Sequence, residues 1–166
     1  MIKEIAMETH SQWYIASPNA IILCVDRRKG TGIEGNLFHG YKKEPTSFTD
    51  LGQVTLLMEK LFDELRFPYP GTNERSFLPH QRQYSPTQER IKIMDDEELL
   101  QKHGDIGTFI IRVQHRQNSS WQGRITWMEE DKTIQFRSVW EMIKLIEEAI
   151  DTVSVPEEGD EPKWSD

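Results

Sequence analysis

The chain has 166 residues, with 28 acidic against 20 basic side chains and a net charge of -8. This length suffices for one ordinary domain or for two small ones that share a core, and a hydrophobic fraction of 36% with an aromatic fraction of 10% excludes global disorder. The negative charge opposes nonspecific attraction to nucleic acid or anionic lipid, so any site for a polyanion must be a local patch.

The sequence contains neither a signal peptide nor a membrane span, since no stretch approaches the roughly 18 apolar residues that a span needs. The single cysteine, Cys24, stands between Leu23 and Val25. It cannot form an intrachain disulfide, and we expect a buried, unreactive thiol. We therefore predict a cytoplasmic protein that does not associate with membranes.

An internal repeat is the clearest feature of the sequence. When the chain is shifted by 88 residues against itself without gaps, residues 22–63 fall on residues 110–151. Eight of these 42 pairs are identical, where ordinary composition gives roughly two or three. The identical pairs are Ile22/Ile110, Val25/Val113, Arg28/Arg116, Gly35/Gly123, Phe48/Phe136, Leu57/Leu145, Glu59/Glu147 and Asp63/Asp151.

The first copy is predicted to contain three strands and then a helix, whose start is marked by Asp50 and Gln53 at the spacing of a capping box. The apolar stripe of that helix consists of Leu51, Val54, Leu57, Met58, Leu61 and Leu65. Gly35, like Gly123 in the second copy, stands within a strand, which indicates a bulge or a close backbone approach. We favour close contact between helix and sheet over the approach of a ligand.

Residues 67–107 form the predicted linker. The stretch Pro68 to Pro86 is expected to run extended across the surface, and Met94 to His103 to form a short helix. Four consecutive carboxylates, residues 95–98, open this short helix. Because such a cluster ordinarily serves the helix dipole and solvation, we assign it no catalytic role.

The second copy repeats the pattern of the first. Apolar residues alternate with polar ones in its strands, and Ser138 with Glu141 forms the capping box of its helix. The strand residues expected to face the helix are Phe109, Ile111, Val113, Trp121, Ile125 and Trp127, with Ile134 and Phe136 marking a third short strand. The helical stripe consists of Val139, Met142, Ile143, Ile146, Ile150 and Val153.

These patterns predict an α+β fold made by tandem duplication of a β-β-β-α module, with antiparallel sheets each covered by one helix and related by a pseudo-twofold axis. A buried cluster of Trp121, Ile125, Phe136 and Ile146 is expected. The predicted divisions are a first repeat with an N-terminal extension, the linker, a second repeat and an acidic disordered tail, at residues 1–66, 67–107, 108–155 and 156–166.

Strand alternation also gathers basic and amide side chains on the sheet face turned away from the helix in the second copy. These candidate binding residues are Arg112, Gln114, Gln122, Arg124 and Arg137. The equivalent positions of the first copy are neutral or acidic: Cys24, Asp26, Glu34, Asn36 and Thr49. The two copies have therefore diverged in charge on this face.

Three interpretations of the basic face follow. In the favoured one, the two faces or their edges pack on one another, with Arg112 or Arg124 reaching Asp26 or Glu34 as ion pairs. In the second, the face is exposed and binds an anionic partner, since guanidinium and carboxamide groups suit phosphate and base edges. In the third, the face is an ordinary solvated surface.

Catalytic and metal-binding motifs are missing from the sequence. There is no glycine-rich phosphate loop, no GxSxG nucleophile elbow and no HExxH helix. The five histidines, at positions 10, 39, 80, 103 and 115, contain no pair at ligand spacing. We therefore predict that the protein is not an enzyme and holds no metal or cofactor.

The segment VQHRQNSSWQG and the later FRSVWEMIKLIEEAI resemble a group of small uncharacterised proteins from clostridia and related anaerobes. The sequence pattern of that group is V-Q-x-R-Q-N-x-x-W-Q-G, followed by F-R-S and an apolar helix. The likeness covers most of residues 20–77 and 108–151. Trp140 stands where the pattern has a small or alkyl residue. The resemblance implies the same architecture and a bacterial cytoplasmic origin, and it carries over no catalytic residue.

The leading functional hypothesis from the sequence is a non-catalytic binding or adaptor protein that acts through contacts with a protein partner or with further copies of itself. Aromatic residues in irregular segments favour it, because such residues often anchor interfaces. They are Trp13, Tyr14, Tyr69 and Tyr84. The alternative is a nucleic-acid or nucleotide binder that uses the face of Arg112, Arg124 and Arg137.

Overall fold

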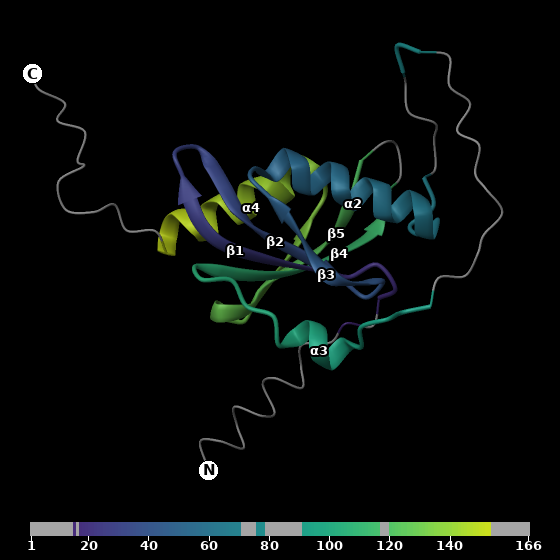
Figure 1. The fold of residues 1–166 in the computed structure, drawn as a ribbon. Helices are drawn as coiled ribbons and strands as arrows, with labels where there is room; N and C mark the ends of the chain where they lie inside the picture. The colour runs from purple at the N-terminus through teal and green to yellow at the C-terminus, as the bar shows by residue number, and fades with distance from the viewer. Residues whose placement is uncertain (1–14, 16, 71–75, 79–90, 117–119, 154–166) are drawn as a thin grey trace, which may run out of the picture.

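The computed structural model describes residues 15, 17–70, 76–78, 91–116 and 120–153. In this part of the chain the protein is α+β, with one six-stranded antiparallel sheet and three α-helices (Figure 1). The strand order is β3-β2-β1-β4-β5-β6. Helices α2 and α4 lie on one face of the sheet, and the short helix α3 lies on the other.

The elements follow the chain order expected from the sequence, three strands and a helix on either side of a linker. The first half consists of β1 (Ile21–Lys29), β2 (Gly32–His39), β3 (Lys42–Phe48) and α2 (Leu51–Leu65). The linker contains α3 (Asp96–Leu100). The second half consists of β4 (Gly107–His115), β5 (Gln122–Trp127), a 3-10 turn (Met128–Glu130), β6 (Lys132–Phe136) and α4 (Val139–Val153).

The halves share one sheet, whereas the sequence predicted two. Strands β1 and β4 pair antiparallel at its centre, with Ile22 opposite Ile110. The pairing is symmetric about that point, because Ile21 lies opposite Ile111 and Leu23 opposite Phe109. The first five residues of each strand are buried whichever face they are on, which is the pattern of central strands rather than of edges. Joining the two strands thus removes two apolar edges.

The main core lies between this sheet and helices α2 and α4. The predicted cluster of Trp121, Ile125, Phe136 and Ile146 is confirmed as part of it. Phe62 of α2 meets Trp121 edge to face, with ring centroids 5.3 Å apart. The core therefore runs continuously under both helices.

Both helices begin with the predicted cap residues, although the Gln53 and Glu141 side chains bind the backbone N–H of the residue before the cap. Asp50 Oδ1 accepts a hydrogen bond of 2.8 Å from the backbone N–H of Gln53, whose side chain accepts one from the backbone of Thr49. In the second half, Ser138 Oγ accepts from the backbone N–H of Glu141, whose carboxylate accepts from the backbone of Arg137. Two free N–H groups are satisfied at each helix start.

Gly35 and Gly123 are required by a neighbouring strand and not, as expected, by a helix. A Cβ on Gly35 would lie 1.9 Å from the carbonyl oxygen of Cys24, and one on Gly123 would lie 2.1 Å from that of Arg112. In each case the register shifts just beyond the glycine, as a bulge does, because Val25 pairs with Gly35 and Val113 with Gly123 before the irregularity. The close backbone approach comes from this local twist.

Ion pairs join the two halves across the sheet centre. Arg28, at the end of β1, reaches Glu147 and Asp151 of α4. Arg116, just after β4, is 2.8 Å from Asp63 of α2. Each arginine thus binds the helix of the other half, and the residues involved come from three of the eight identical repeat pairs.

The opposite face of the sheet carries a smaller core. Residues from the N-terminal side, the linker and the 3-10 turn pack there on the central strands. This second core consists of Ile15, Ala20, Ile22, Cys24, Met94, Leu99, Ile110 and Met128, with Phe38 and Leu100 packed against it. It covers the face mainly over β1, β2 and the adjoining part of β4.

Some expectations lie outside the described residues, namely the acidic tail at 156–166, most of the N-terminal extension and most of the extended run from Pro68 to Pro86. Among the helices that the structure does describe, none has the length and apolar character needed to cross a membrane.

Candidate functional site

A row of polar side chains crosses β4, β5 and β6 on the face away from α2 and α4. Arg112 of β4 lies directly opposite Arg124 of β5, and Arg124 lies opposite Gln135 of β6. Their neighbours along each strand, such as Ile111 and Ile125, belong to the helix-covered core. Because side chains alternate along a strand, the three polar residues share the helix-free face.

The charge of these three strands is of one sign. Strands β4, β5 and β6 contain no aspartate or glutamate, while Arg112, Arg124 and Lys132 are cationic. Strands β1 to β3, in contrast, contain Asp26 and Glu34. Lys132 lines the pocket on the helix side, so on the helix-free face the cationic residues of these strands are Arg112 and Arg124, on a chain with a net charge of -8.

The surroundings of Arg112, at the centre of the row, disfavour its charge. Arg112 is half-buried and Arg124 is exposed. Burial and then the charge of Arg124 lower the pKa of the Arg112 guanidinium. Like charges directly opposite each other on a sheet are destabilising. An anion placed between the two guanidinium groups would relieve this repulsion.

The other predicted site residues separate into two groups. Gln114 is exposed at the β4 bulge, and Gln122 begins β5 beside it. Arg137 instead binds Glu141 of α4, with its Nη2 2.9 Å from Oε2 of that carboxylate. This contact raises the pKa of Arg137 and lowers that of Glu141. Arg137 therefore supports the start of α4, and the structure does not bring it into the arginine row.

Two features of the face were missed from the sequence. Gln135 extends the row, and Thr126 shares a hydrogen bond of 2.8 Å with Thr133 between their hydroxyl groups. The alternation around Phe136 would have placed Gln135 and Thr133 on this face. The third strand was defined only by its two apolar residues, so its polar positions were not followed.

The acidic residues on the first half of the same face bind different partners from those expected. Glu34 binds Arg27, 3.0 Å away on the neighbouring strand. Asp26 accepts hydrogen bonds from Asn36 and from the backbone of Asp105. The acidic groups are thus engaged within their own half and by the linker. The ion pairs that join the halves lie instead at Arg28 and Arg116.

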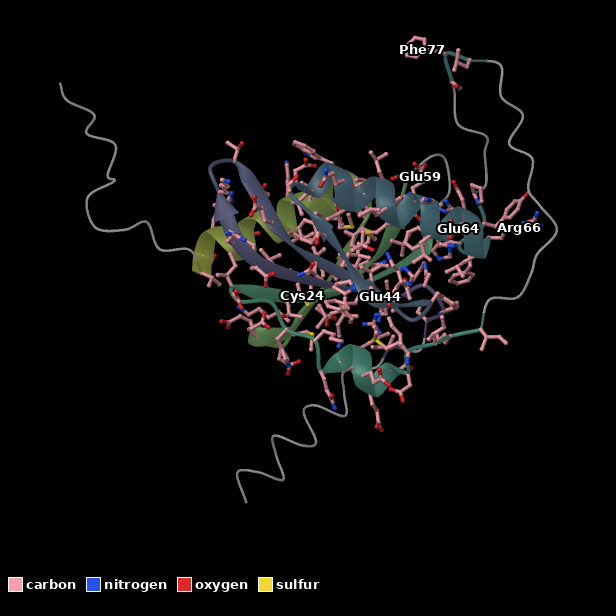
Figure 2. The ribbon with its side chains drawn as sticks, viewed as in Figure 1. Cys24, Glu44, Glu59, Glu64, Arg66 and Phe77 are labelled. Carbon is pink, nitrogen blue, oxygen red and sulfur yellow. The ribbon has the colours of Figure 1, made fainter. Side chains whose placement is uncertain are left out.

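Cys24 lies on the helix-free face of the sheet, in the part of the second core that the linker covers (Figure 2). Its side chain is buried, and burial, followed by the charges of Asp26 and Glu129, raises the pKa of the thiol to about 12. The expectation of a buried thiol is confirmed. A thiol with this pKa is almost entirely protonated at neutral pH and is a poor nucleophile.

Most of the aromatic residues proposed as interface anchors lie outside the described part of the chain, namely Trp13, Tyr14 and Tyr84. Tyr69 is 68% exposed. Trp140, the departure from the resemblance pattern, is 64% exposed on α4 and has the ammonium group of Lys144 5.2 Å from its ring centroid. Trp140 thus lies on the outer surface of α4 and not in the core.

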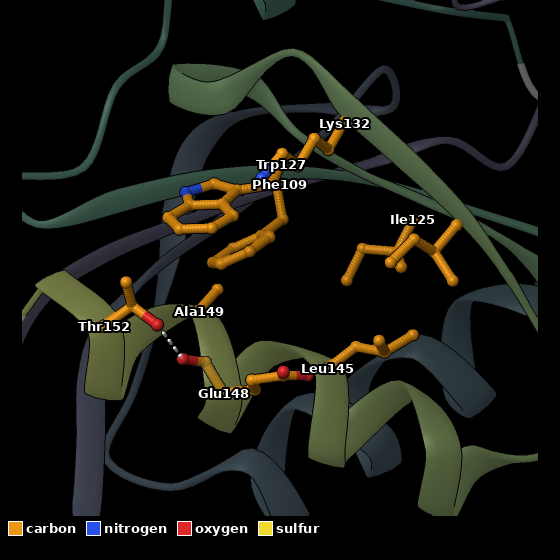
Figure 3. Close-up of a pocket in the computed structure, with 9 residues that line it drawn as sticks. Phe109, Ile125, Trp127, Lys132, Leu145, Glu148, Ala149 and Thr152 are labelled. Carbon is orange, nitrogen blue, oxygen red and sulfur yellow. Dashed lines mark hydrogen bonds between the residues drawn. The ribbon is translucent and has the colours of Figure 1, made fainter.

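A pocket of about 260 Å³ opens between α4 and the second half of the sheet (Figure 3). Leu145 and Ala149 of α4 face Ile125 and Phe109 of the sheet across it. Lys132, Ile134, Trp127, Glu148 and Thr152 complete the lining. The pocket is mainly apolar and lies on the helix side, so it is separate from the arginine row.

The described residues contain no group of three or more histidine, cysteine, aspartate or glutamate side chains placed to hold a metal ion. The comparisons with known proteins gave no match of the chain to a protein-family model, to a curated protein or to a solved structure. The functional argument therefore rests on the geometry of this fold.

Proposed function

We propose that the protein is a non-catalytic nucleic-acid-binding protein that holds the phosphate backbone of its partner on the face formed by β4, β5 and β6. The observation that carries this proposal is the opposed pair Arg112 and Arg124, on strands that contain no acidic residue. Guanidinium groups bind phosphate with two parallel hydrogen bonds, and the charge of both arginines is favoured once a phosphate lies between them.

The side chains around the arginine pair also favour nucleic acid. Gln122 and Gln135 offer amide donors and acceptors next to the arginines. Protein-binding surfaces have apolar centres, whereas surfaces that bind nucleic acid are more polar and more positively charged. The row of Arg112, Arg124 and Gln135 contains no apolar side chain. We therefore rank nucleic acid above a protein partner at this face.

The tandem duplication is part of the same proposal. It is supported by the symmetric pairing about Ile22 and Ile110, by capping boxes 88 residues apart and by bulges beyond both Gly35 and Gly123. The reciprocal ion pairs of Arg28 and Arg116 support it further. A duplicated module lets one copy keep a covered face while the other copy acquires a binding face.

The proposal is tested by fluorescence anisotropy with labelled single-stranded RNA, single-stranded DNA and duplex DNA of about 20 nucleotides, each measured across a salt series. The double variant Arg112→Gln, Arg124→Gln should bind at least roughly tenfold more weakly than the natural chain. The slope of log affinity against log salt should become shallower by about 1 to 2, since two phosphate contacts are removed.

The matched control is Lys42→Gln, Lys43→Gln on β3, which removes the same charge from the other edge of the sheet, where both lysines are exposed. It should keep most of the affinity and of the salt slope. Equal losses in the two double variants would show that only net charge matters. That result, or the absence of binding to all three probes at low salt, would contradict the proposal.

Protein contacts are the second candidate function, favoured by apolar side chains that the structure leaves exposed. Leu56 of α2, Ile134 of β6 and Trp140 of α4 are 66%, 48% and 64% exposed. These residues lie away from the arginine row. A protein partner and a nucleic acid would therefore occupy different surfaces.

A further inference from the structure

The two outer strands of the sheet are protected to very different degrees. Strand β3 has the sequence KKEPTSF, in which Pro45 and three consecutive charged residues are exposed. Proline and lysine on an edge strand prevent pairing with another chain. Strand β6 has the sequence KTIQF, without proline and with one charge. Within the described part of the chain, the β6 edge is therefore open to a further strand, and the β3 edge is not.

An apolar surface adjoins the open edge on the helix side. Ile134 of β6 is 48% exposed and lies at the pocket lined by Leu145 and Ala149 of α4 (Figure 3). A strand added next to β6 would place alternate side chains over Ile134 and over the mouth of this pocket. Backbone hydrogen bonds and apolar burial would then occur together.

We infer that the β6 edge binds the β6 edge of a second copy of this chain, which forms a twofold dimer with a continuous sheet. An antiparallel pairing centred on Ile134 sets Ile134 against itself, Thr133 against Gln135 and Lys132 against Phe136. No like charges lie opposite each other in this register. The next pair outward sets Asp131 opposite Arg137, whose guanidinium is bound to Glu141 within its own copy, so no like charges meet there either.

The fold already contains this kind of junction. Strands β1 and β4 pair antiparallel about Ile22 and Ile110, with α2 and α4 on the same side of the sheet. A β6 to β6 junction would repeat that arrangement, with two copies of α4 on one side and the apolar Ile134 pair between sheet and helices. Self-pairing therefore requires no geometry that the protein does not already use.

The inference does not depend on the proposed binding of nucleic acid, since it uses the edge and the helix side of the sheet. It is tested by sedimentation velocity of the natural chain over a range of micromolar concentrations. A monomer–dimer equilibrium is expected. Ile134→Lys should give a monomer at every concentration, because it places two positive charges together on the axis and removes the apolar contact.

The matched control is Thr46→Lys. Thr46 is the residue of β3 that corresponds to Ile134 by the shift of 88, and β3 already carries Lys42 and Lys43. This variant should retain the dimer.

Thermal unfolding and circular dichroism check that the Ile134→Lys monomer is folded, as we expect, so that loss of the dimer is not caused by unfolding. A natural chain that stays monomeric throughout the concentration range would overturn the inference, even if the β6 edge captured some other protein or a small molecule. A dimer that persists in Ile134→Lys, or that is lost equally in Thr46→Lys, would place the interface elsewhere and would also overturn it.

Discussion

The two halves of the helix-free face are built on the same strand pattern but differ in what covers them. In the first half, Phe38 and Cys24 pack under the linker, with Leu99 of α3 buried against the sheet. In the second half, Arg112 is half-buried and Arg124 is exposed, with no carboxylate on their strands. Among the described residues, the linker therefore covers mainly the first of the two corresponding faces.

This difference shows that the two sides of the sheet constrain the two halves unequally. On the helix side the two halves are equivalent, because each apolar stripe must be buried for the sheet to be stable. On the other side the second core takes most of its strand residues from the first half, with Ile110 and Met128 from the second. Among the described residues, the rest of the second half carries the arginine pair on which the proposed function rests.

The largest expected effect tests whether the halves are equivalent on the helix side. Phe136 and Phe48 correspond to each other in the repeat and are 0% and 2% exposed. We expect Phe136→Ala and Phe48→Ala each to lower the free energy of unfolding by about 3 to 5 kcal/mol, the range for removal of a buried aromatic side chain. Denaturation by urea measures both. A loss below about 1 kcal/mol in either variant would show that the two halves are packed differently.

The next effect tests the cover over the first half. Leu99 is 1% exposed, so Leu99→Ala should cost about 2 to 3 kcal/mol and loosen α3. Because the same core buries Cys24, the variant should also react faster with a thiol reagent in the folded state. Gln135→Ala, on the uncovered half, should change stability by less than about 0.5 kcal/mol and leave the thiol rate unaltered. An unaltered thiol rate in Leu99→Ala would mean that α3 does not protect the cysteine.

The smallest effect concerns Arg124. Burial and then the charge of Arg124 lower the pKa of Arg112, which means that the folded state disfavours the charge of Arg112, in part because Arg124 is present. Arg124→Gln should therefore raise the free energy of unfolding slightly, by roughly 0.2 to 1 kcal/mol. The interpretation of Arg124 as an ion pair between the halves predicts the opposite sign, a lower melting temperature. Thermal unfolding at low salt, where the repulsion is strongest, distinguishes the two.

The sequence by itself determined most of the local structure. Alternation identified the strands and the residues that face the helices, and Asp50 with Gln53 and Ser138 with Glu141 located both helix starts. These features depend on residues close together in the chain, whose effects on a strand or on a first helical turn are local. The polar residues of the helix-free face were found in the same way, except for Gln135, Thr126 and Thr133.

The tertiary structure alone decided how the halves are joined and which candidate residues lie together. Pairing of β1 with β4 is a contact between distant segments, and the apolar character of both strands is equally compatible with burial in two sheets or in one. Arg137 was assigned to the basic face by strand alternation, but the chain turns into α4 at that point and Glu141 takes its guanidinium. Likewise, Glu34 forms its ion pair with Arg27 on an adjacent strand. Charged side chains are long, so their partners are set by which elements the fold brings near them, and periodicity along the chain contains no such information.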